Sequence, residues 1–574
     1  MRRARWATVG VLVCLAFACR RPEEAPAGAR PAQPMPGPSP ARAAVETPVE
    51  GGVLRRRLVA EPTTLNAVMQ SSAAEAEVLQ YVQRNLLDFD GQMRLVPGLA
   101  ERWDASPNGL EYTLTLRADA VWEDGRPITA RDAAFTIGRI ADPKVPSNVY
   151  KPLFEEMESV QAMDERTLRV RFKSPYAFRA MAFVIPVLPE KRFAGQNFLR
   201  ARENRAPVAS GPYRVASWTT QQSIVLERNP RYRGEPGHYD RIVFRILPDD
   251  TTAYRLLTAG ELDEDQLSPS IKDQAIRDGA FQSCCRIVEF YNLDYNYVAL
   301  NNRSPLFSDA RVRRALTMLL DRASIVRGLY KGTARIVSGP WAPDSPAYDP
   351  GLAALPFDPP AAAKLLEEAG WRDSNGNGTR DKDGREFEFD LLVSQGSEVG
   401  RQIDEMLASE LAKVGVTARV RMLEWGSFVE KVDSGDFAAA SLAWSAVDPN
   451  PDPYFYWHSS QCAPNGLNDG CYRNPEADRL MEEARRDADS GRRNAIYHRL
   501  HRIFRDDAPA LFIVNAAQKY AFRRDVRGVQ ISPLSFFFWP GPLDWGATAS
   551  SGAPASRSPS PTPIPGSPSP KPAA

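Results

Sequence analysis

Residues 387–444 carry the pattern that decides the fold, and they run FEFDLLVSQGSEVGRQIDEMLASELAKVGVTARVRMLEWGSFVEKVDSGDFAAASLAW. Apolar residues recur at every second position in some stretches and at every third or fourth position in others. These periods predict strands at 387–393, 416–422 and 437–444 and helices at 401–414 and 426–434. Strand–helix alternation of this kind predicts an α/β lobe with a largely parallel sheet, in which the apolar run 437–444 is buried on both faces.

The chain on the N-terminal side of this segment follows another pattern. Residues 111–117 alternate, with Tyr112, Leu114 and Leu116 on one face, and residues 167–172 alternate in the same way. Such alternation is typical of strands with one face toward the core and the other toward water. Further helices are expected at 310–320, 359–370 and 474–504. The 574 residues therefore hold a β-rich first part and an α/β second part, enough for more than one domain.

The composition excludes two broad classes of protein. Lys and Arg number 72 and Asp and Glu number 71, which gives a net charge of +1. That balance argues against the broad basic footprint of a nucleic-acid-binding protein. With four His and six Cys, the chain is also not a His- and Cys-rich protein with many metal sites. Hydrophobic residues at 43% and charged residues at 25% are typical of a globular body.

The first nineteen residues are typical of a targeting segment. Arg2, Arg3 and Arg5 form a basic start, and an apolar run follows from residue 6 to residue 18. This run is shorter than the roughly 20 residues of a membrane-spanning helix. The sequence LAFAC at 15–19 resembles a bacterial lipoprotein signal, so residues 1–19 are predicted to be a lipoprotein signal peptide with Cys19 as the lipidated residue. An ordinary signal peptide cut after residue 18 is the alternative.

Two proline-rich stretches flank the body. Residues 20–50 and residues 547–574 each contain eight prolines and show no apolar periodicity. Such sequences bury too little apolar surface to offset the entropy lost on ordering. We expect a disordered tether at 20–50 and a disordered tail at 547–574, with a lipid anchor holding the body at a membrane. No second apolar run of membrane-spanning length follows in the body.

A series of short motifs occurs in order along the body. They are LVPGLAERW (95–103), YTLTLR (112–117), VWEDG (121–125), ITARD (128–132), SGPY (210–213), RNPRY (228–232), GELD (260–263), FSDARVRRA (307–315), MLLDR (318–322) and HSSQ (458–461). Each motif alone is weak. Together they resemble the peptide/nickel family of extracellular solute-binding proteins, family 5, which deliver ligands to ATP-binding-cassette (ABC) importers.

The resemblance implies an α/β, two-lobed periplasmic-binding-protein fold of the large, three-subdomain type that closes around its ligand about a hinge. The implied parts are a discontinuous lobe I at 51–85, 197–285 and 517–546, a subdomain inserted in it at 86–196, and lobe II at 286–516. It also implies a monomeric, non-enzymatic protein on the periplasmic or extracellular side of the membrane. Its expected partners are a peptide ligand and the permease subunits of an importer, and no nucleic acid.

The resemblance also points to ligand-binding residues. In peptide-binding relatives, the strand that matches 437–444 and the residues after it hydrogen-bond to the extended ligand backbone, and a nearby Asp receives the ligand's N-terminal ammonium. The matching residues are Trp444, Ser445, Ala446, Val447, Asp448 and Asp452. Asp448 is the favoured partner of the ammonium, and Asp452 is the alternative because this segment looks one residue longer than in a dipeptide-binding relative. A proline-rich surface loop with solvated acids is the competing interpretation.

On the other lobe, Leu65 and Asn66 resemble a Leu-Asp pair of the family. In the family this pair places the following small residues against the ligand backbone. Here those residues are Ser71, Ser72 and Ala73. Small residues permit close backbone approach, although they suit any packed turn equally well.

Two other functions remain open at this point. One is the binding of a non-peptide solute, such as a metal chelate or an oligosaccharide, by the same fold. The other is a secreted hydrolase, which the sequence makes improbable because it contains neither H-E-x-x-H nor G-x-S-x-G.

The sequence contains a candidate calcium loop and four cysteines in the body. Oxygen-bearing residues follow the spacing of a calcium loop at Asp373, Asn375, Asn377, Thr379 and Asp381, but Gly384 replaces the usual Glu at the twelfth position. Such an ion would be structural, and a metal-free turn is the alternative; no other cofactor is expected. Cys462 and Cys471 close a short loop that a disulfide can bridge in an envelope protein. The adjacent Cys284 and Cys285 are expected to be free buried thiols.

Overall fold

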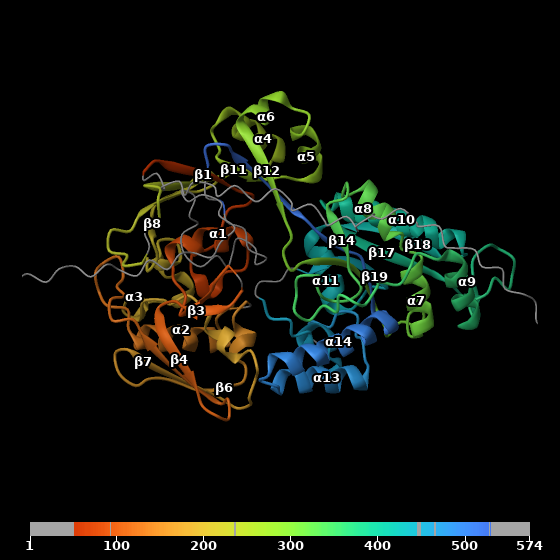
Figure 1. Ribbon diagram of the computed structural model, residues 1–574, viewed down its shortest axis with the longest axis horizontal. Coiled ribbons are helices and arrows are strands. Elements are labelled where there is room, and N and C mark those ends of the chain that lie inside the picture. The colour runs from red at the N-terminus through yellow and green to blue at the C-terminus, as the bar shows by residue number, and fades with distance from the viewer. Residues whose placement is uncertain are drawn as a thin grey trace, which may run out of the picture. The chain divides into compact units, whose positions relative to one another are not determined.

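The segment that decides the fold forms the centre of a five-stranded sheet in this computed structural model (Figure 1). The order is β18 (Thr417–Leu423), β17 (Glu388–Ser394), β19 (Ala439–Trp444), β13 (Tyr295–Leu300) and β20 (Ala510–Phe512). β17 runs parallel to β18 and β19, whereas β13 runs antiparallel to β19 and β20. The sheet is therefore mixed rather than largely parallel, because only residues 387–444 contain the helical crossovers that parallel neighbours need.

The structure describes residues 51–91, 93–147, 149–234, 237–444, 449–463, 466–526 and 529. They all belong to one compact unit of the chain, so the division of the body into lobes with the stated boundaries stays a prediction. The signal segment, the tether and the tail lie outside the described residues. None of the described helices combines the length and the apolar character needed to cross a membrane.

Strand β19 is less buried than its apolar sequence predicts. Ala439 and Ala440 are buried, but the remaining four residues are partly or fully exposed. The reason is the pairing: β17 pairs with β19 only at Ala439 and Ala440, whereas β13 accompanies β19 to its end at Trp444. Beyond Ala440, one edge of β19 therefore has no strand partner among the described residues.

Helices cover the sheet as the apolar periodicity predicts. α10 (Glu398–Lys413) packs on β17 and β18 through a buried stripe of Ile403, Leu407 and Leu411, and Gly415 follows with a left-handed φ of 77°. α11 (Trp425–Ser434) also contacts β17. Two helical pairs complete this region. One pair is α7 (Ala310–Met318) with α9 (Pro359–Glu368). The other is α13 (Pro475–Arg486) with α14 (Ser490–Asp507), and the two helices of this second pair lie side by side in Figure 1.

The first part of the chain forms two four-stranded sheets. One has the order β1 (Val53–Leu58), β10 (Arg241–Ile246), β9 (Ser223–Arg228) and β8 (Tyr213–Thr219), and α1 (Ala73–Val82) contacts β8. The other has the order β4 (Ala100–Ala105), β5 (Glu111–Leu116), β7 (Thr167–Phe172) and β6 (Met157–Ala162), and α2 (Ala130–Ala141) contacts β6 and β7. Every second residue of β5 is buried, which confirms the predicted alternation.

A third sheet joins distant segments in the order β11 (Glu264–Gln266), β22 (Gln518–Arg523) and β12 (Cys285–Phe290). Three consecutive arginines of β1 each pair with one of three consecutive acids at β11. The pairs are Arg55–Asp263, Arg56–Glu264 and Arg57–Asp265. Arg56 and Glu264 are both buried, and such charges require partners of opposite sign. This ladder attaches the N-terminal strand to the third sheet.

The remaining elements are short. The helices are α3 (Glu190–Phe193), α4 (Asp250–Ala259), α5 (Pro269–Ala275), α6 (Gly279–Cys284), α8 (Arg322–Gly328) and α12 (Tyr454–Trp457). The strand pairs are β2 (Leu87–Phe89) with β3 (Leu95–Pro97), β14 (Ala334–Ile336) with β21 (Val514–Ala516), and β15 (Asp381–Lys382) with β16 (Arg385–Glu386).

Candidate ligand-binding site

Strand β19 carries the chain to the predicted ligand-binding segment. Its last residue, Trp444, pairs with Tyr295 of β13, and the indole ring lies against the ring of Tyr456 with the centroids 3.9 Å apart. The four predicted residues that follow, Ser445, Ala446, Val447 and Asp448, lie outside the described residues. The described part of the site therefore consists of the end of β19 and the chain that resumes at residue 449.

Asp452 lies in this resumed segment, and its side chain is 1% exposed. Its carboxylate Oδ2 is 3.3 Å from Nε of Arg485 and accepts a hydrogen bond of 3.0 Å from the Tyr176 hydroxyl. Oδ1 accepts a bond of 3.1 Å from the amide of Tyr454. Burial raises the pKa of the Asp452 carboxyl, and Arg485 opposes that shift. The chain itself thus supplies a cation and two further donors to Asp452.

Arg485 stands at the end of α13 among aromatic rings. Its guanidinium carbon lies 4.0 Å from the ring centroid of Tyr454 and 4.9 Å from that of Tyr176. The carbonyl of Arg485 also accepts a bond of 2.7 Å from the amide of Ala177. Tyr176, Tyr454 and Arg485 line part of a cavity of about 440 Å³ that lies between residues 152–182 and the α12–α13 region. The segment around Tyr176 is therefore bound to α13 through both side chains and backbone.

Ser71, Ser72 and Ala73 are exposed at the start of α1. Ser72 is the N-cap of this helix, and Glu75 Oε2 accepts the amides of both Ser71 and Ser72 at 2.5 Å and 2.9 Å. The amides of Ser71 and Ser72 are thus bound by Glu75, the Ser72 amide as part of the capping box, while the side chains of all three residues are exposed. No hydrogen bond or ion pair joins the three residues to Trp444 or Asp452 within the described ranges. Their role in ligand binding stays a prediction.

The candidate calcium loop is closed by its own side chains. Asp373 accepts three backbone amides, from Gly376 and Asn377 through Oδ1 and from Gly378 through Oδ2. Asp381 accepts both the amide and the hydroxyl of Ser374. Across the described residues, no group of three or more His, Cys, Asp or Glu side chains is arranged to hold a metal ion. Asp373 and Asp381 thus form hydrogen bonds within the loop, and calcium binding stays a prediction.

The four cysteines of the body form two pairs. Cys462 and Cys471 are disulfide-bonded, as predicted. Cys284 and Cys285 are also paired, at the junction where α6 ends and β12 begins. The expectation of free thiols at these two positions was therefore wrong.

Sequence reasoning missed three residues of this region, namely Tyr176, Arg485 and Asp469. Tyr176 and Arg485 surround Asp452, but Tyr176 is 276 positions away from it in the chain. Both belong to stretches with ordinary surface or helical patterns, so no local signal marks them. The Asp-Gly pair at 469–470 does predict a turn, and its place inside the disulfide loop is the one sequence feature that singles out Asp469.

Comparison with solved structures establishes the class of protein. The oligopeptide-binding protein AppA of Bacillus subtilis, solved in complex with a nonapeptide, superimposes with a TM-score of 0.73 at 27% identity, over 86% of this chain and 99% of that one. The fold is therefore the α/β, two-lobed fold of periplasmic solute-binding proteins.

The family follows from the sequence match. Residues 94–466 match the bacterial extracellular solute-binding proteins, family 5 Middle, and the chain belongs to this family. Among its relatives, AppA is 29% identical over 86% of this chain and 92% of its own length. Di/tripeptide-binding protein 2 of Pseudomonas aeruginosa is 27% identical (78% and 86% covered), and Heme-binding protein A of Haemophilus influenzae is 26% identical (83% and 88% covered). The family is one of extracellular or periplasmic solute-binding proteins and not of enzymes.

Proposed function

We propose that this protein captures peptides outside the cytoplasmic membrane and delivers them to an ABC importer. The observation that carries the proposal is the edge of β19 from Ser441 to Trp444, which no strand of the described residues covers and which precedes residues 445–448 in the chain. An extended peptide can add to such an edge through main-chain hydrogen bonds that do not depend on the peptide's sequence. The names of two relatives, an oligopeptide-binding and a di/tripeptide-binding protein, support this ligand class.

In this proposal, Ser445, Ala446 and Val447 continue the backbone contacts and Asp448 receives the ligand's α-ammonium. Asp448 is favoured over Asp452 because Arg485 already neutralises Asp452. Ser71, Ser72 and Ala73 contact the ligand from the other lobe. The protein acts as a monomer, a lipid on Cys19 holds it at the membrane, and any calcium in the 373–381 loop is structural.

The test is mass spectrometry of ligand that stays bound through purification under non-denaturing conditions, followed by titration of the stripped protein with a peptide mixture while hydrolysis is monitored. We expect intact peptides in the purified protein and saturable binding without cleavage. The second candidate is a non-peptide solute, which similarity to a haem-binding relative favours. A bound chelate or sugar, together with no binding from the peptide mixture, would replace the peptide proposal, and cleavage would indicate a hydrolase.

A further inference from the structure

A second feature near the end of β19 is a small cavity with aromatic walls and a single acidic side chain. Its lining includes Tyr295, Tyr297, Trp444, Tyr456, Trp457 and Asp469. The ring centroids of Tyr297 and Trp457 are 6.3 Å apart, and those of Tyr295 and Tyr297 are 5.6 Å apart. The rest of the wall is apolar or backbone, and no Lys, Arg or His lines the cavity among the described residues.

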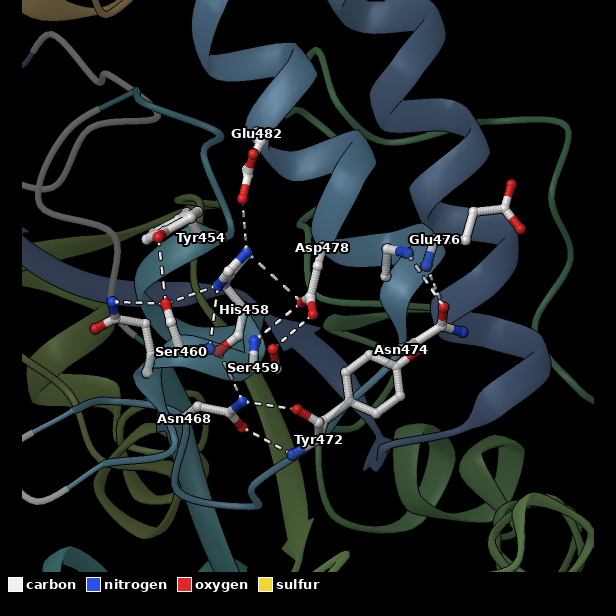
Figure 2. Close-up of polar contacts among 12 residues, drawn as sticks. Tyr454, His458, Ser459, Ser460, Asn468, Tyr472, Asn474, Glu476, Asp478 and Glu482 are labelled. Atoms are coloured by element: carbon white, nitrogen blue, oxygen red, sulfur yellow. Dashed lines mark hydrogen bonds and ion pairs between the residues drawn. The ribbon is translucent and has the colours of Figure 1, made fainter. Parts of the chain in front are cut away.

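The turn that carries Asp469 is held in place from several sides. The disulfide between Cys462 and Cys471 closes the loop around it. The Asn468 side chain donates to the carbonyls of His458 and Tyr472 at 3.1 Å and 3.0 Å and accepts the amide of Tyr472 at 3.0 Å (Figure 2). Asp469 is therefore fixed next to the cavity before any ligand arrives.

The next residue ties this turn to strand β13. A Cβ atom on Gly470 would lie 2.7 Å from the carbonyl oxygen of Leu300, so only glycine permits this approach. The carbonyl of Gly470 also accepts the amide of Asn302 at 2.8 Å. Because Tyr297 belongs to the same strand, the turn and this part of the ring wall are attached to one element.

Asp469 lacks a counter-ion. It makes no hydrogen bond or ion pair with any residue in the described part of the chain, and the charged group that acts on it most strongly is another acid, Asp433 of α11. Burial raises the pKa of Asp469 to about 7, because the ionised carboxylate is poorly solvated there. Asp469 is partly buried, and a partly buried carboxylate with no partner is poorly solvated. A cation that enters the cavity would stabilise its ionised form.

The aromatic walls and the size of the cavity specify the kind of cation. Ring faces attract cations, and the attraction is stronger where water is excluded. The cavity volume is about 20 Å³, which is room for about one group the size of a water molecule. An ammonium group has that size, whereas a guanidinium or an aromatic ring is much larger.

From this juxtaposition we infer that Asp469 and the rings of Tyr297, Trp444 and Tyr456 bind one primary ammonium group of the ligand. The inference rests on the proposed binding of peptides and adds a chemical preference to it. A lysine side chain and a peptide α-ammonium both present this group. Asp469 supplies the charge, and the rings exclude water and larger cations.

The experiment compares matched peptides that carry lysine or norleucine at one position, each with a free and an acetylated N-terminus. Calorimetry on the wild-type protein should show tighter binding of the lysine peptides by about 10- to 100-fold, the range of a charge-assisted contact. Asp469→Asn should abolish this preference and leave norleucine peptides unaffected. Asp433→Asn is the matched control, since Asp433 is exposed on α11, and it should keep the preference.

Each other outcome also decides the question. If the lost affinity follows the free N-terminus rather than lysine, the pocket holds the α-ammonium. Equal binding of all four peptides by the wild-type protein, or an unchanged preference in a folded Asp469→Asn variant, overturns the inference. If no peptide binds, the peptide function fails, and the pocket is tested alone with n-butylammonium against n-butanol. A thermal shift with the amine that is lost in Asp469→Asn supports the pocket, and no shift refutes it.

Discussion

Arg485 and Asp452 form an ion pair in which the carboxylate is 1% exposed and the guanidinium side chain 23%, with Nε and Oδ2 3.3 Å apart. The pair also connects distant parts of the chain, because Tyr176 donates to the same carboxylate oxygen. A carboxylate that already has a cation and a hydroxyl donor gains little from a second cation. Asp452 therefore has the environment of a residue that holds the site together.

The first prediction tests this role. Asp452→Ala would leave Arg485 and Tyr176 without their acceptor, and it should lower the free energy of unfolding by about 3–5 kcal/mol, as the loss of one member of a buried pair does. Urea denaturation measures the effect. The control is Glu483→Ala on α13, the helix that carries Arg485. This change breaks the exposed ion pair between Glu483 and Arg479 and should change stability little. A stable Asp452→Ala variant that fails to bind peptides would instead make Asp452 a ligand residue.

The second prediction concerns Asp448. If Asp448 pairs with the ligand's ammonium as proposed, Asp448→Asn should weaken a free peptide without lysine by about 150- to 5,000-fold, the cost of breaking a buried charge pair. An N-acetylated version of that peptide should bind weakly to both proteins. Calorimetry with the two peptides provides the measurement. If Asp452→Asn shows the selective loss instead, the ammonium site is four residues further along the chain.

The third prediction concerns the disulfide of the Asp469 loop. Replacing Cys462 and Cys471 together with serine should cost about 2.5 kcal/mol, the loop-entropy contribution of a bridge that closes about ten residues. Thermal denaturation of the variant and of the oxidised wild-type protein measures the difference, because the Cys284–Cys285 bridge is present in both. Because the loop carries Asp469, the variant should also lose part of the preference for lysine over norleucine. Full retention of that preference would show that Asn468 and Gly470 hold the turn without the bridge.

The fourth prediction is a dependence of stability on pH that arises at Asp404. This side chain is fully buried in α10 against the hydroxyl of Ser441, and burial raises its pKa from 3.8 to about 7. At a pH between these two pKa values, Asp404 keeps its proton in the folded protein but has released it in the unfolded chain. The contribution of Asp404 to the free energy of unfolding therefore decreases as the pH rises from about 4 to about 7.

Asp404→Asn removes this titration. The variant should match the wild-type protein at pH 4 and exceed its stability by about 4 kcal/mol at pH 8, as measured by urea denaturation across that range. Glu410→Gln, which changes a surface acid paired with Lys413 on the same helix, serves as the control. Parallel pH profiles for wild type and Asp404→Asn would contradict the assignment.

The fifth prediction concerns the N-terminus. Cys19→Ala should prevent lipid attachment, so that the body is released from the membrane or the precursor stays uncut. Membrane fractionation and the mass of the N-terminal fragment distinguish these results. Unchanged attachment and an unchanged N-terminal mass would show that Cys19 carries no lipid, and cleavage after residue 18 would then be the simpler explanation.

Local patterns in the sequence predicted many of the elements. The alternation at 111–117 and 167–172 corresponds to β5 and β7, and the predicted helices at 401–414 and 426–434 correspond to α10 and α11. Those patterns hold because each depends on which face of a single element meets the core. The prediction of a largely parallel sheet was wrong, because the orientations of β13 and β20 depend on where the chain enters and leaves that sheet.

The sequence by itself determined the type of most elements, the ordered motifs of the family and the cysteine pair at 462 and 471. Only the tertiary structure decided that β19 loses its partner β17 after Ala440 and that Tyr176 and Arg485 enclose Asp452. It also decided that Asp469 lines one cavity together with five aromatic residues from β13, β19 and α12. The physical reason is that periodicity records how one segment faces the core, whereas a binding site is made by side chains from segments that are far apart in the chain.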